Sequence, residues 1–344
     1  MLDLFFFLSG ENPSLPFSEV ISVLEAEELS FFNVKVLPQI LFLKGDLKCL
    51  DATSRRCAFL KSSGIRILSC EARKDEIIRL AKDAPFEKFV SKNESFSVRV
   101  HGIQEAKLNI DSKELESDLG ETILKSVEGA RVDLANPSKV FTGFLAEKTF
   151  VFGLRTFETQ HKFEDRKPSK RPFSHPAAFP PKLARCMVNL TRPKADEIVL
   201  DPFCGTGSML IEAGLIGCQV VGIDIDPKMV KGSSVNLHHF GVAPLGLIVG
   251  DACSLGLREE AHIVTDPPYG RSSSTHGFKA KELVENFLRF SLENMGKGGF
   301  LCLASPKNIK ADRVGSDLGF IVTERHFAYV NKDLTRQIVV FRKL

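Results

Sequence analysis

The sequence predicts an α/β protein whose carboxyl-terminal half is a Rossmann-like, doubly wound sheet. From residue 181 onward, apolar strand-like segments alternate with helix-like segments, which is typical of a mostly parallel sheet with helices on both faces. A glycine-rich turn follows the first of these strands, at a place where such sheets hold ligands. The last two apolar segments, 320–330 and 336–342, have no helix between them and predict an antiparallel hairpin at the edge of the sheet.

The expected elements of this half follow one another in order. Helices are expected at residues 181–190, 208–215, 227–240 and 280–295, and strands at 197–200, 219–223, 245–249, 262–265 and 300–304. Parallel strands need long crossover connections, and the intervening helices supply them. We therefore assign residues 181–344 to one domain.

The first 155 residues predict an α+β arrangement in front of this domain. Residues 1–47 hold apolar runs at 4–8, 31–37 and 40–43 around an acidic helix-like stretch at 18–28. Residues 48–155 hold a period-two segment at 96–100, a helical pattern at 112–126 and apolar runs at 140–144 and 149–153. Residues 156–180 are rich in proline, lysine and arginine, so we expect a linker there.

Composition indicates a soluble globular chain, because 43% of the 344 residues are hydrophobic and 26% are charged. The net charge of +3 is uneven: residues 161–194 carry nine Lys or Arg against Glu164 and Asp165. This segment is expected either to contact an acidic partner or to be a solvated loop. No apolar run reaches the roughly 18 residues of a membrane span, and residues 1–8 lack the features of a signal peptide, so a cytoplasmic location without membrane contact is expected.

The eight cysteines are scattered and form neither a Cys-x-x-Cys pair nor a cluster with histidine at zinc spacing. We expect no disulfide and no metal. Cys204 could be proposed as a nucleophile, as in enzymes that methylate carbon 5 of pyrimidines. No activating neighbour is evident in the sequence, so we expect it to be a small packed residue.

The glycine-rich turn predicts a binding site for a nucleoside cofactor. It lies between the strand 197–200 and the helix that begins at residue 208, and its glycines permit close approach of a ligand. Its candidate cofactor-binding residues are Asp201, Pro202, Cys204, Gly205, Thr206 and Gly207. The alternative is a merely structural connection between a strand and a helix.

Acidic residues follow the next two strands. Asp224 ends the second strand, 19 residues after Gly205, where it can accept hydrogen bonds from both ribose hydroxyls. Asp251 follows the third strand, beside Ala252, and can accept a hydrogen bond from an adenine amino group. A nicotinamide enzyme would show the same spacing, so spacing alone does not select the cofactor.

The fourth strand ends in Asp266-Pro267-Pro268-Tyr269, which indicates methylation of an exocyclic amino group on a nucleobase. Such a nitrogen is a poor nucleophile, because its lone pair is delocalised into the ring. The Asp266 carboxylate and the Pro267 carbonyl can accept both amino hydrogens, Pro268 adds stiffness, and Tyr269 can stack on the base. The alternative is an ordinary turn, although a core-filling role would favour Phe in a chain with 28 Phe and two Tyr.

These residues resemble the archaeal tRNA guanine N2-methyltransferases that modify the guanosine at position ten. The resemblance rests on segments 171–176, 181–185 and 188–190, the glycine run and residues 266–270, and on 132–137 and 150–153 in the first half. It implies a ferredoxin-like unit at 1–47, an RNA-binding THUMP domain at 48–155, a basic linker at 156–180 and a methyltransferase domain at 181–344.

The resemblance also implies S-adenosylmethionine as methyl donor and tRNA as substrate, with the target guanine swung out of the RNA. We expect the protein to be a monomer. The residues expected to contact the RNA are Arg171, Phe173, Lys182, Arg185 and Arg271. The serine-rich segment 270–277 is expected to be a mobile loop that orders over the substrate. Methylation of another RNA or of DNA, a non-catalytic RNA-binding role, and a nicotinamide oxidoreductase remain the alternatives.

Overall fold

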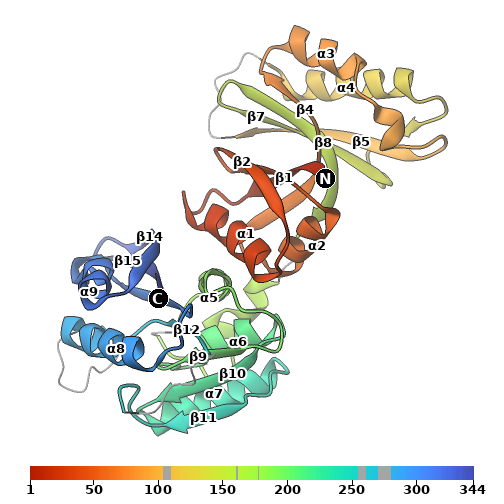
Figure 1. The fold of residues 1–344 in the computed structure, drawn as a ribbon. Coiled ribbons are helices and arrows are strands. Elements are labelled where there is room, and N and C mark those ends of the chain that lie inside the picture. The colour runs from red at the N-terminus through yellow and green to blue at the C-terminus, as the bar shows by residue number, and fades with distance from the viewer. Residues whose placement is uncertain (104–109, 160–161, 177, 255–260, 270–279) are drawn as a thin grey trace. The chain divides into compact units, whose positions relative to one another are not determined.

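The computed structural model describes all residues except 104–109, 160–161, 177, 255–260 and 270–279. The chain divides into two compact units (Figure 1). The amino-terminal unit comprises residues 1–13, 29–55 and 60–160, and the carboxyl-terminal unit comprises residues 14–28, 56–59 and 161–344.

The amino-terminal unit contains an eight-stranded sheet with the order β2-β3-β1-β4-β8-β7-β5-β6. Its strands are β1 Leu2–Leu8, β2 Phe31–Leu37, β3 Ile40–Gly45, β4 Leu60–Glu71, β5 Ser95–Ile103, β6 Arg131–Val132, β7 Lys139–Ala146 and β8 Thr149–Glu158. Its helical segments are α2 Leu47–Arg56, α3 Lys74–Lys82, the 3-10 turn η1 Phe86–Lys88 and α4 Ser112–Ser126. The helices α3 and α4 lie side by side (Figure 1), and the core beneath them is rich in phenylalanine.

The long strand β4 joins the two halves of this sheet, because it pairs with both β1 and β8. Where β4 and β8 run together, a Cβ on Gly64 would lie 2.0 Å from the carbonyl oxygen of Leu154, and a Cβ on Gly153 would lie 2.2 Å from that of Ile65. Only glycine tolerates such a close approach of backbone to backbone. The two glycines therefore allow the sheet to continue from β1 to β6.

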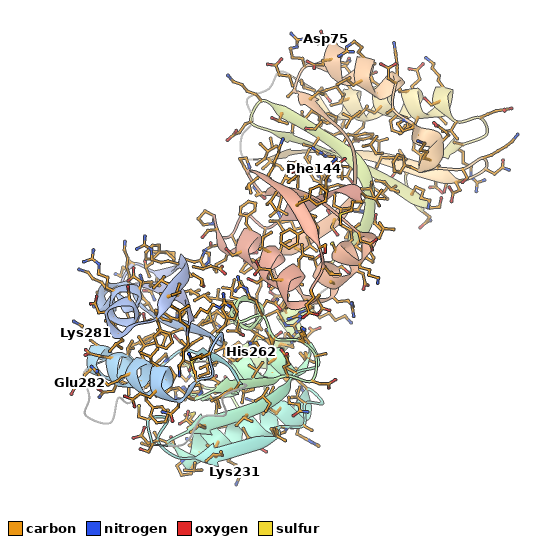
Figure 2. The ribbon with its side chains drawn as sticks, in the orientation of Figure 1. Asp75, Phe144, Lys231, His262, Lys281 and Glu282 are labelled. Carbon is orange, nitrogen blue, oxygen red and sulfur yellow. The ribbon has the colours of Figure 1, made fainter. Side chains whose placement is uncertain are left out.

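Aromatic packing also links the strands of this sheet. Phe5 of β1 meets Phe144 of β7 edge to face, with the ring centroids 5.5 Å apart. Phe144 is labelled in Figure 2. Residues 1–47 and 48–155 thus contribute strands to one sheet and side chains to one apolar cluster. The assignments of these segments as a ferredoxin-like unit and a THUMP domain stay predictions.

The carboxyl-terminal unit contains a seven-stranded sheet with the order β11-β10-β9-β12-β13-β15-β14. Its strands are β9 Ile198–Asp201, β10 Gln219–Asp224, β11 Gly246–Val249, β12 His262–Thr265, β13 Phe300–Pro306, β14 Ile321–Asn331 and β15 Leu334–Arg342. Its helices are α1 Leu15–Ala26, α5 Pro181–Leu190, α6 Ser208–Gly214, α7 Pro227–His239, α8 Ala280–Asn294 and α9 Ala311–Leu318, with 3-10 turns η2 Phe163–Arg166, η3 Pro168–Lys170 and η4 Lys307–Ile309. The strands β9 to β13 are parallel, and β15 pairs antiparallel with β13 and β14.

The fold class expected for this half is confirmed: the sheet is doubly wound, with an antiparallel hairpin at one edge. Its helices and strands match the expected ranges with small shifts at their ends. The sequence prediction omitted α9, α2, α3 and β4. The helix α9 has only eight residues, of which Ala311 and Gly315 are buried, so its apolar periodicity is too short to recognise.

One helix from near the start of the chain belongs to the carboxyl-terminal unit. The helix α1 packs against α5, and Glu19 of α1 is completely buried there. The Glu19 carboxylate accepts hydrogen bonds from the backbone N–H groups of Ala58 and Phe59, at 2.8 and 2.9 Å, and from the side-chain amide of Asn189 at 2.9 Å. The division of the chain in space therefore differs from the linear boundaries expected at residues 47 and 155.

Candidate active site

The candidate site lies at the carboxyl ends of the parallel strands. The strand order reverses at β9, since β10 and β11 lie on one side of it and β12 and β13 on the other. Ligands of doubly wound sheets bind outside the strand ends at such a switch point. A cavity of about 1160 Å³ opens there. Its lining includes residues from the glycine turn, the two following acidic strand ends and Asp266-Pro267-Pro268-Tyr269.

The glycine turn presents an open surface at Gly205. This residue has a φ of +51°, and a Cβ on it would meet only the carbonyl oxygen of Phe203, at 4.0 Å. Its backbone N–H donates a hydrogen bond to Asp224 Oδ2 at 2.8 Å, and the N–H of Asp226 donates to Asp224 Oδ1 at 3.0 Å. These hydrogen bonds hold the Asp224 carboxylate next to the glycine turn at Gly205.

Gly207 allows the glycine turn to pack closely against the helix α7. Its φ is +83°, and a Cβ on it would lie 2.5 Å from the hydroxyl oxygen of Ser233 in α7. Unlike Gly205 and Thr206, it does not line the cavity. The structure therefore places Gly207 in the packing of the turn against α7, and its expected cofactor contact stays a prediction.

The other residues expected to bind a cofactor line the cavity: Pro202, Cys204, Thr206, Asp251 and Ala252. The Asp251 carboxylate accepts the backbone N–H of Cys253 at 2.9 Å, which orients it at the start of the loop after β11. Burial raises the pKa of the Cys204 thiol well above its usual value, with the nearby carboxylates Asp201 and Asp224 acting in the same direction. The thiol is therefore protonated at neutral pH, which agrees with the expectation that Cys204 is not a nucleophile.

Asp266 stands directly after β12, with its side chain only 15% exposed. Its Oδ1 atom is buried and has no hydrogen-bond partner among the described residues. Burial raises the pKa of its carboxyl group to about 7, although the Arg336 guanidinium acts in the opposite direction. The hydroxyl of Tyr269 is likewise buried without a partner within the described part of the chain. Two unsatisfied polar atoms in one cavity indicate that a polar ligand completes the site.

Asp201 connects the ends of β9 and β12. Its Oδ1 atom accepts hydrogen bonds from the hydroxyl of Thr265, at 2.7 Å, and from the N–H of Phe203, at 3.1 Å. Burial raises the pKa of Asp201 to about 7. The side chain is 3% exposed, so its main effect is to hold the glycine turn against the strand that carries Asp266.

Two residues of the cavity were not predicted from the sequence. Arg336 of β15 places its Nη2 atom 3.5 Å from Asp266 Oδ2, and its guanidinium lies 4.7 Å from the ring centroid of Phe179. Both residues line the cavity. Arg336 is far from Asp266 in the sequence, and only the pairing of β15 with β13, which sets Arg336 opposite Pro306, brings it to the strand ends. No local motif signals that pairing.

The arginines expected to contact the substrate are instead buried inside the unit. Arg171 is 5% exposed and donates hydrogen bonds to Ser208 Oγ at 2.6 Å and to the backbone oxygen of Arg166 at 2.9 Å. Arg185 is 3% exposed and forms an ion pair with the fully buried Glu212 at 2.9 Å. These guanidinium groups cannot reach a bulky partner in this arrangement, so the expected role is corrected to a structural one.

Phe173 and Lys182 also lie outside the cavity lining. The backbone of Phe173 is held by the side-chain amide of Asn236, and its ring fills the space left by Gly232 of α7. Lys182 extends its ammonium group to 5.0 Å from the ring centroid of Phe59. Arg271 and the expected loop 270–277 lie outside the described residues.

The surplus charge of residues 161–194 is largely used within the unit. Arg166 joins Arg185 on Glu212 at 2.7 Å, and Arg192 bridges Glu25 and Glu324, both at 2.6 Å. Buried and partly buried arginines of this kind require such partners. Neither expectation for this segment, an acidic partner or a solvated loop, describes these arginines.

Cationic side chains do border the cavity elsewhere. Lys307 and Lys310 follow β13, and Lys332 lies in the turn between β14 and β15. His262, in contrast, stands at the start of β12, away from the ligand end, and is held by the carbonyl of Thr191 at 2.6 Å and by Glu197 at 3.0 Å (Figure 2). It is a structural histidine.

Two other features are absent from the described residues. No group of three or more His, Cys, Asp or Glu side chains is arranged to hold a metal ion. None of the described helices combines the length and the apolar character needed to cross a membrane.

Comparison with known protein families gives matches over both halves of the chain. A family model described as RMKL-like, methyltransferase domain, matches residues 168–338, which include the whole candidate site from the glycine turn to Arg336. A second model, described as DNA methylase, matches residues 68–235 and ends before Asp266.

Individual relatives are similar over the full length. A tRNA (guanine(10)-N2)-dimethyltransferase from Methanothermobacter thermautotrophicus is 36% identical to this chain, and the match covers 100% of both proteins. The protein of the same description from Methanocaldococcus jannaschii is 31% identical over 98% of this chain and 99% of its own. Among solved structures, TrmN from Thermus thermophilus has a TM-score of 0.57 and 18% sequence identity to this chain. The match covers 99% of this chain and 100% of TrmN, and it supports the fold.

Proposed function

The chain belongs to the family of tRNA (guanine(10)-N2)-dimethyltransferases, and from this premise we propose that it methylates the exocyclic N2 of the guanosine at position ten of tRNA. The methyl donor is S-adenosylmethionine, and the products are N2-methylguanosine and N2,N2-dimethylguanosine. The observation that carries the proposal is the Asp266 carboxylate, which offers a buried, unpartnered oxygen at the switch-point cavity. Cytoplasmic location and a monomeric state stay predictions.

The residues at the ends of β9, β10 and β11 fit S-adenosylmethionine. Gly205 leaves open space at the turn, Asp224 is oriented by two backbone N–H groups, and Asp251 stands at the next strand end. In the proposed site, Asp224 accepts from the ribose hydroxyls and Asp251 from the adenine amino group. When bound, the cofactor supplies a methyl group already activated by its positive sulfur.

The Asp266-Pro267-Pro268-Tyr269 segment holds the guanine. Asp266 Oδ1 and the Pro267 carbonyl accept hydrogen bonds from the 2-amino group, which directs the nitrogen lone pair toward the methyl donor. Tyr269 stacks on the base and offers its unpartnered hydroxyl. With a pKa of about 7, the Asp266 carboxylate is basic enough to accept the proton that the nitrogen loses on methylation.

The lysines that border the cavity, rather than the buried arginines of residues 161–194, supply the positive charge for the RNA in this proposal. Lys307, Lys310 and Lys332 lie at the rim where the nucleotides next to the target guanosine arrive. Phosphate contacts of this kind position the substrate and make its binding weaken as salt concentration rises.

The test is to incubate the protein with labelled S-adenosylmethionine and an unmodified tRNA transcript, digest the RNA and identify the labelled nucleoside by mass spectrometry. N2-methylguanosine and N2,N2-dimethylguanosine are expected, and a transcript with adenosine at position ten should take no label. Label in another nucleoside, or label in duplex DNA and none in tRNA, would contradict the proposal.

The variant Asp266→Ala should abolish methyl transfer and still bind S-adenosylmethionine, because Asp266 contacts the base rather than the glycine turn. Cofactor affinity measured by calorimetry separates this result from misfolding. Activity within a few-fold of the wild type would remove Asp266 from the catalytic role.

A further inference from the structure

The arrangement of Asp266 and Arg336 offers more than an acceptor for the amino group. The unpartnered Oδ1 atom of Asp266 stands on one side of the carboxylate, and Oδ2 faces Arg336 Nη2 at 3.5 Å. The cavity thus offers two neighbouring acceptors, Asp266 Oδ1 and Oδ2, and beside Oδ2 a cationic donor, the Arg336 guanidinium. The donor is held in place, because its guanidinium packs over the Phe179 ring and the Arg336 side chain is only 12% exposed.

This order of groups matches one edge of guanine. Along its Watson–Crick edge, guanine presents the 2-amino donor, the N1–H donor and the O6 acceptor in sequence. A guanine whose amino group meets Asp266 Oδ1 presents its N1–H to Oδ2 and its O6 to the guanidinium. Arginine also donates to O6, together with N7, in the commonest specific contact to guanine in the major groove of DNA.

We propose that Arg336 is a specificity-determining residue of this site, which selects guanine by donating a hydrogen bond to its O6. The inference rests on the proposed function and adds the means by which the target base is recognised. Adenine in the same orientation would place its 6-amino group against the guanidinium and its unprotonated N1 against Asp266 Oδ2. A donor facing a donor, with both desolvated, is strongly unfavourable.

The electrostatic effect of Arg336 on Asp266 is a separate role, and the test must distinguish the two. Loss of the positive charge would slow methylation of every base that carries a 2-amino group, because it acts on the Asp266 carboxylate alone. Loss of an O6 contact would slow only bases that carry O6. The ratio of kcat/KM for two substrates, measured on one enzyme preparation, is independent of the folded fraction and reports the second role directly.

The experiment uses synthetic tRNA that carries guanosine, 2-aminopurine or 6-thioguanosine at position ten. 2-Aminopurine keeps the amino group but lacks both O6 and the N1–H donor, whereas 6-thioguanosine keeps N1–H and changes only O6, which it replaces by a weaker acceptor. Arg336→Ala should lower kcat/KM for guanosine by a factor about 10- to 100-fold larger than that for 2-aminopurine, the range expected for one specific arginine–guanine contact. Arg336→Ala should also lower kcat/KM more for guanosine than for 6-thioguanosine, but by a smaller factor than in the comparison with 2-aminopurine.

Arg325→Ala is the matched control, since Arg325 lies on the neighbouring strand β14, is 56% exposed and pairs with Asp312. It should leave the substrate ratio unchanged. Arg336→Lys keeps the charge but loses the planar fork of guanidinium donors, and should restore part of the ratio. An equal loss for guanosine and 2-aminopurine in Arg336→Ala would overturn the inference, whereas failure of the wild type to methylate guanosine would overturn the proposed function itself.

Discussion

Methyl transfer by this protein should depend on pH through the ionisation of Asp266. Burial raises the pKa of this carboxyl group from 3.8 to about 7. A raised carboxyl pKa means that the anion, which accepts the amino hydrogens, forms only as pH rises through about 7. At pH 6 only about one molecule in eleven carries the anion, so kcat/KM should be about tenfold below its plateau above pH 8.

The assay is initial-rate methylation of the tRNA transcript from pH 5.5 to 9 with saturating S-adenosylmethionine, so that kcat/KM for tRNA reports the ionisation of the enzyme–cofactor complex and not cofactor binding. Arg336→Ala should move the inflection to higher pH, because the guanidinium lowers the pKa of Asp266. Asp201, whose pKa is also raised to about 7, could titrate in the same range. Asp201→Asn keeps the Oδ1 acceptor for Thr265 and should leave the inflection in place.

A wild-type profile that is flat between pH 6 and pH 8.5 would refute this reasoning. It would show that the carboxyl group is either ionised throughout or not required in ionised form. An inflection that disappears in Asp201→Asn would reassign the titration to Asp201.

Three further predictions follow from the packing. Asp224→Ala should weaken S-adenosylmethionine binding by at least tenfold in calorimetry and lower thermal stability, because the N–H groups of Gly205 and Asp226 lose their acceptor. Unchanged affinity would remove Asp224 from the ribose role. Gly207→Ala should lower the free energy of unfolding by about 1–3 kcal/mol in a urea titration, since its φ is +83° and the new Cβ would meet Ser233 Oγ at 2.5 Å. The control Gly241→Ala should lower it less, because Gly241 has a φ of +71° and open space around the new Cβ. Glu19→Ala should destabilise the carboxyl-terminal unit by about 3 kcal/mol, because three buried donors lose their acceptor; an unchanged unfolding midpoint would contradict that estimate.

The fold of the carboxyl-terminal half and the core of the site follow from local patterns. Alternating apolar segments set the order of helices and strands, and the ligand end of a parallel strand is by geometry its carboxyl end. That is why Asp224, Asp251 and Asp266 could be assigned to one cavity before their neighbours were known. The cavity lining bears out this grouping.

Other features depend on contacts between segments far apart in the sequence, and no local pattern carries that information. The basic run at 161–194 predicts a charged surface, yet Glu212 and Glu324 neutralise several of its arginines inside the fold. The helix α1 stands early in the chain and packs on α5 because Glu19 finds its donors there.

The sequence by itself determined the chemistry of the site, because Asp266-Pro267-Pro268-Tyr269 and the glycine turn are each contiguous and take their geometry from a single strand end. The tertiary structure alone decided what surrounds that chemistry. Arg336 reaches Asp266 only because β15 pairs antiparallel with β13, a register set by the burial of both strands and not by any residue near Asp266.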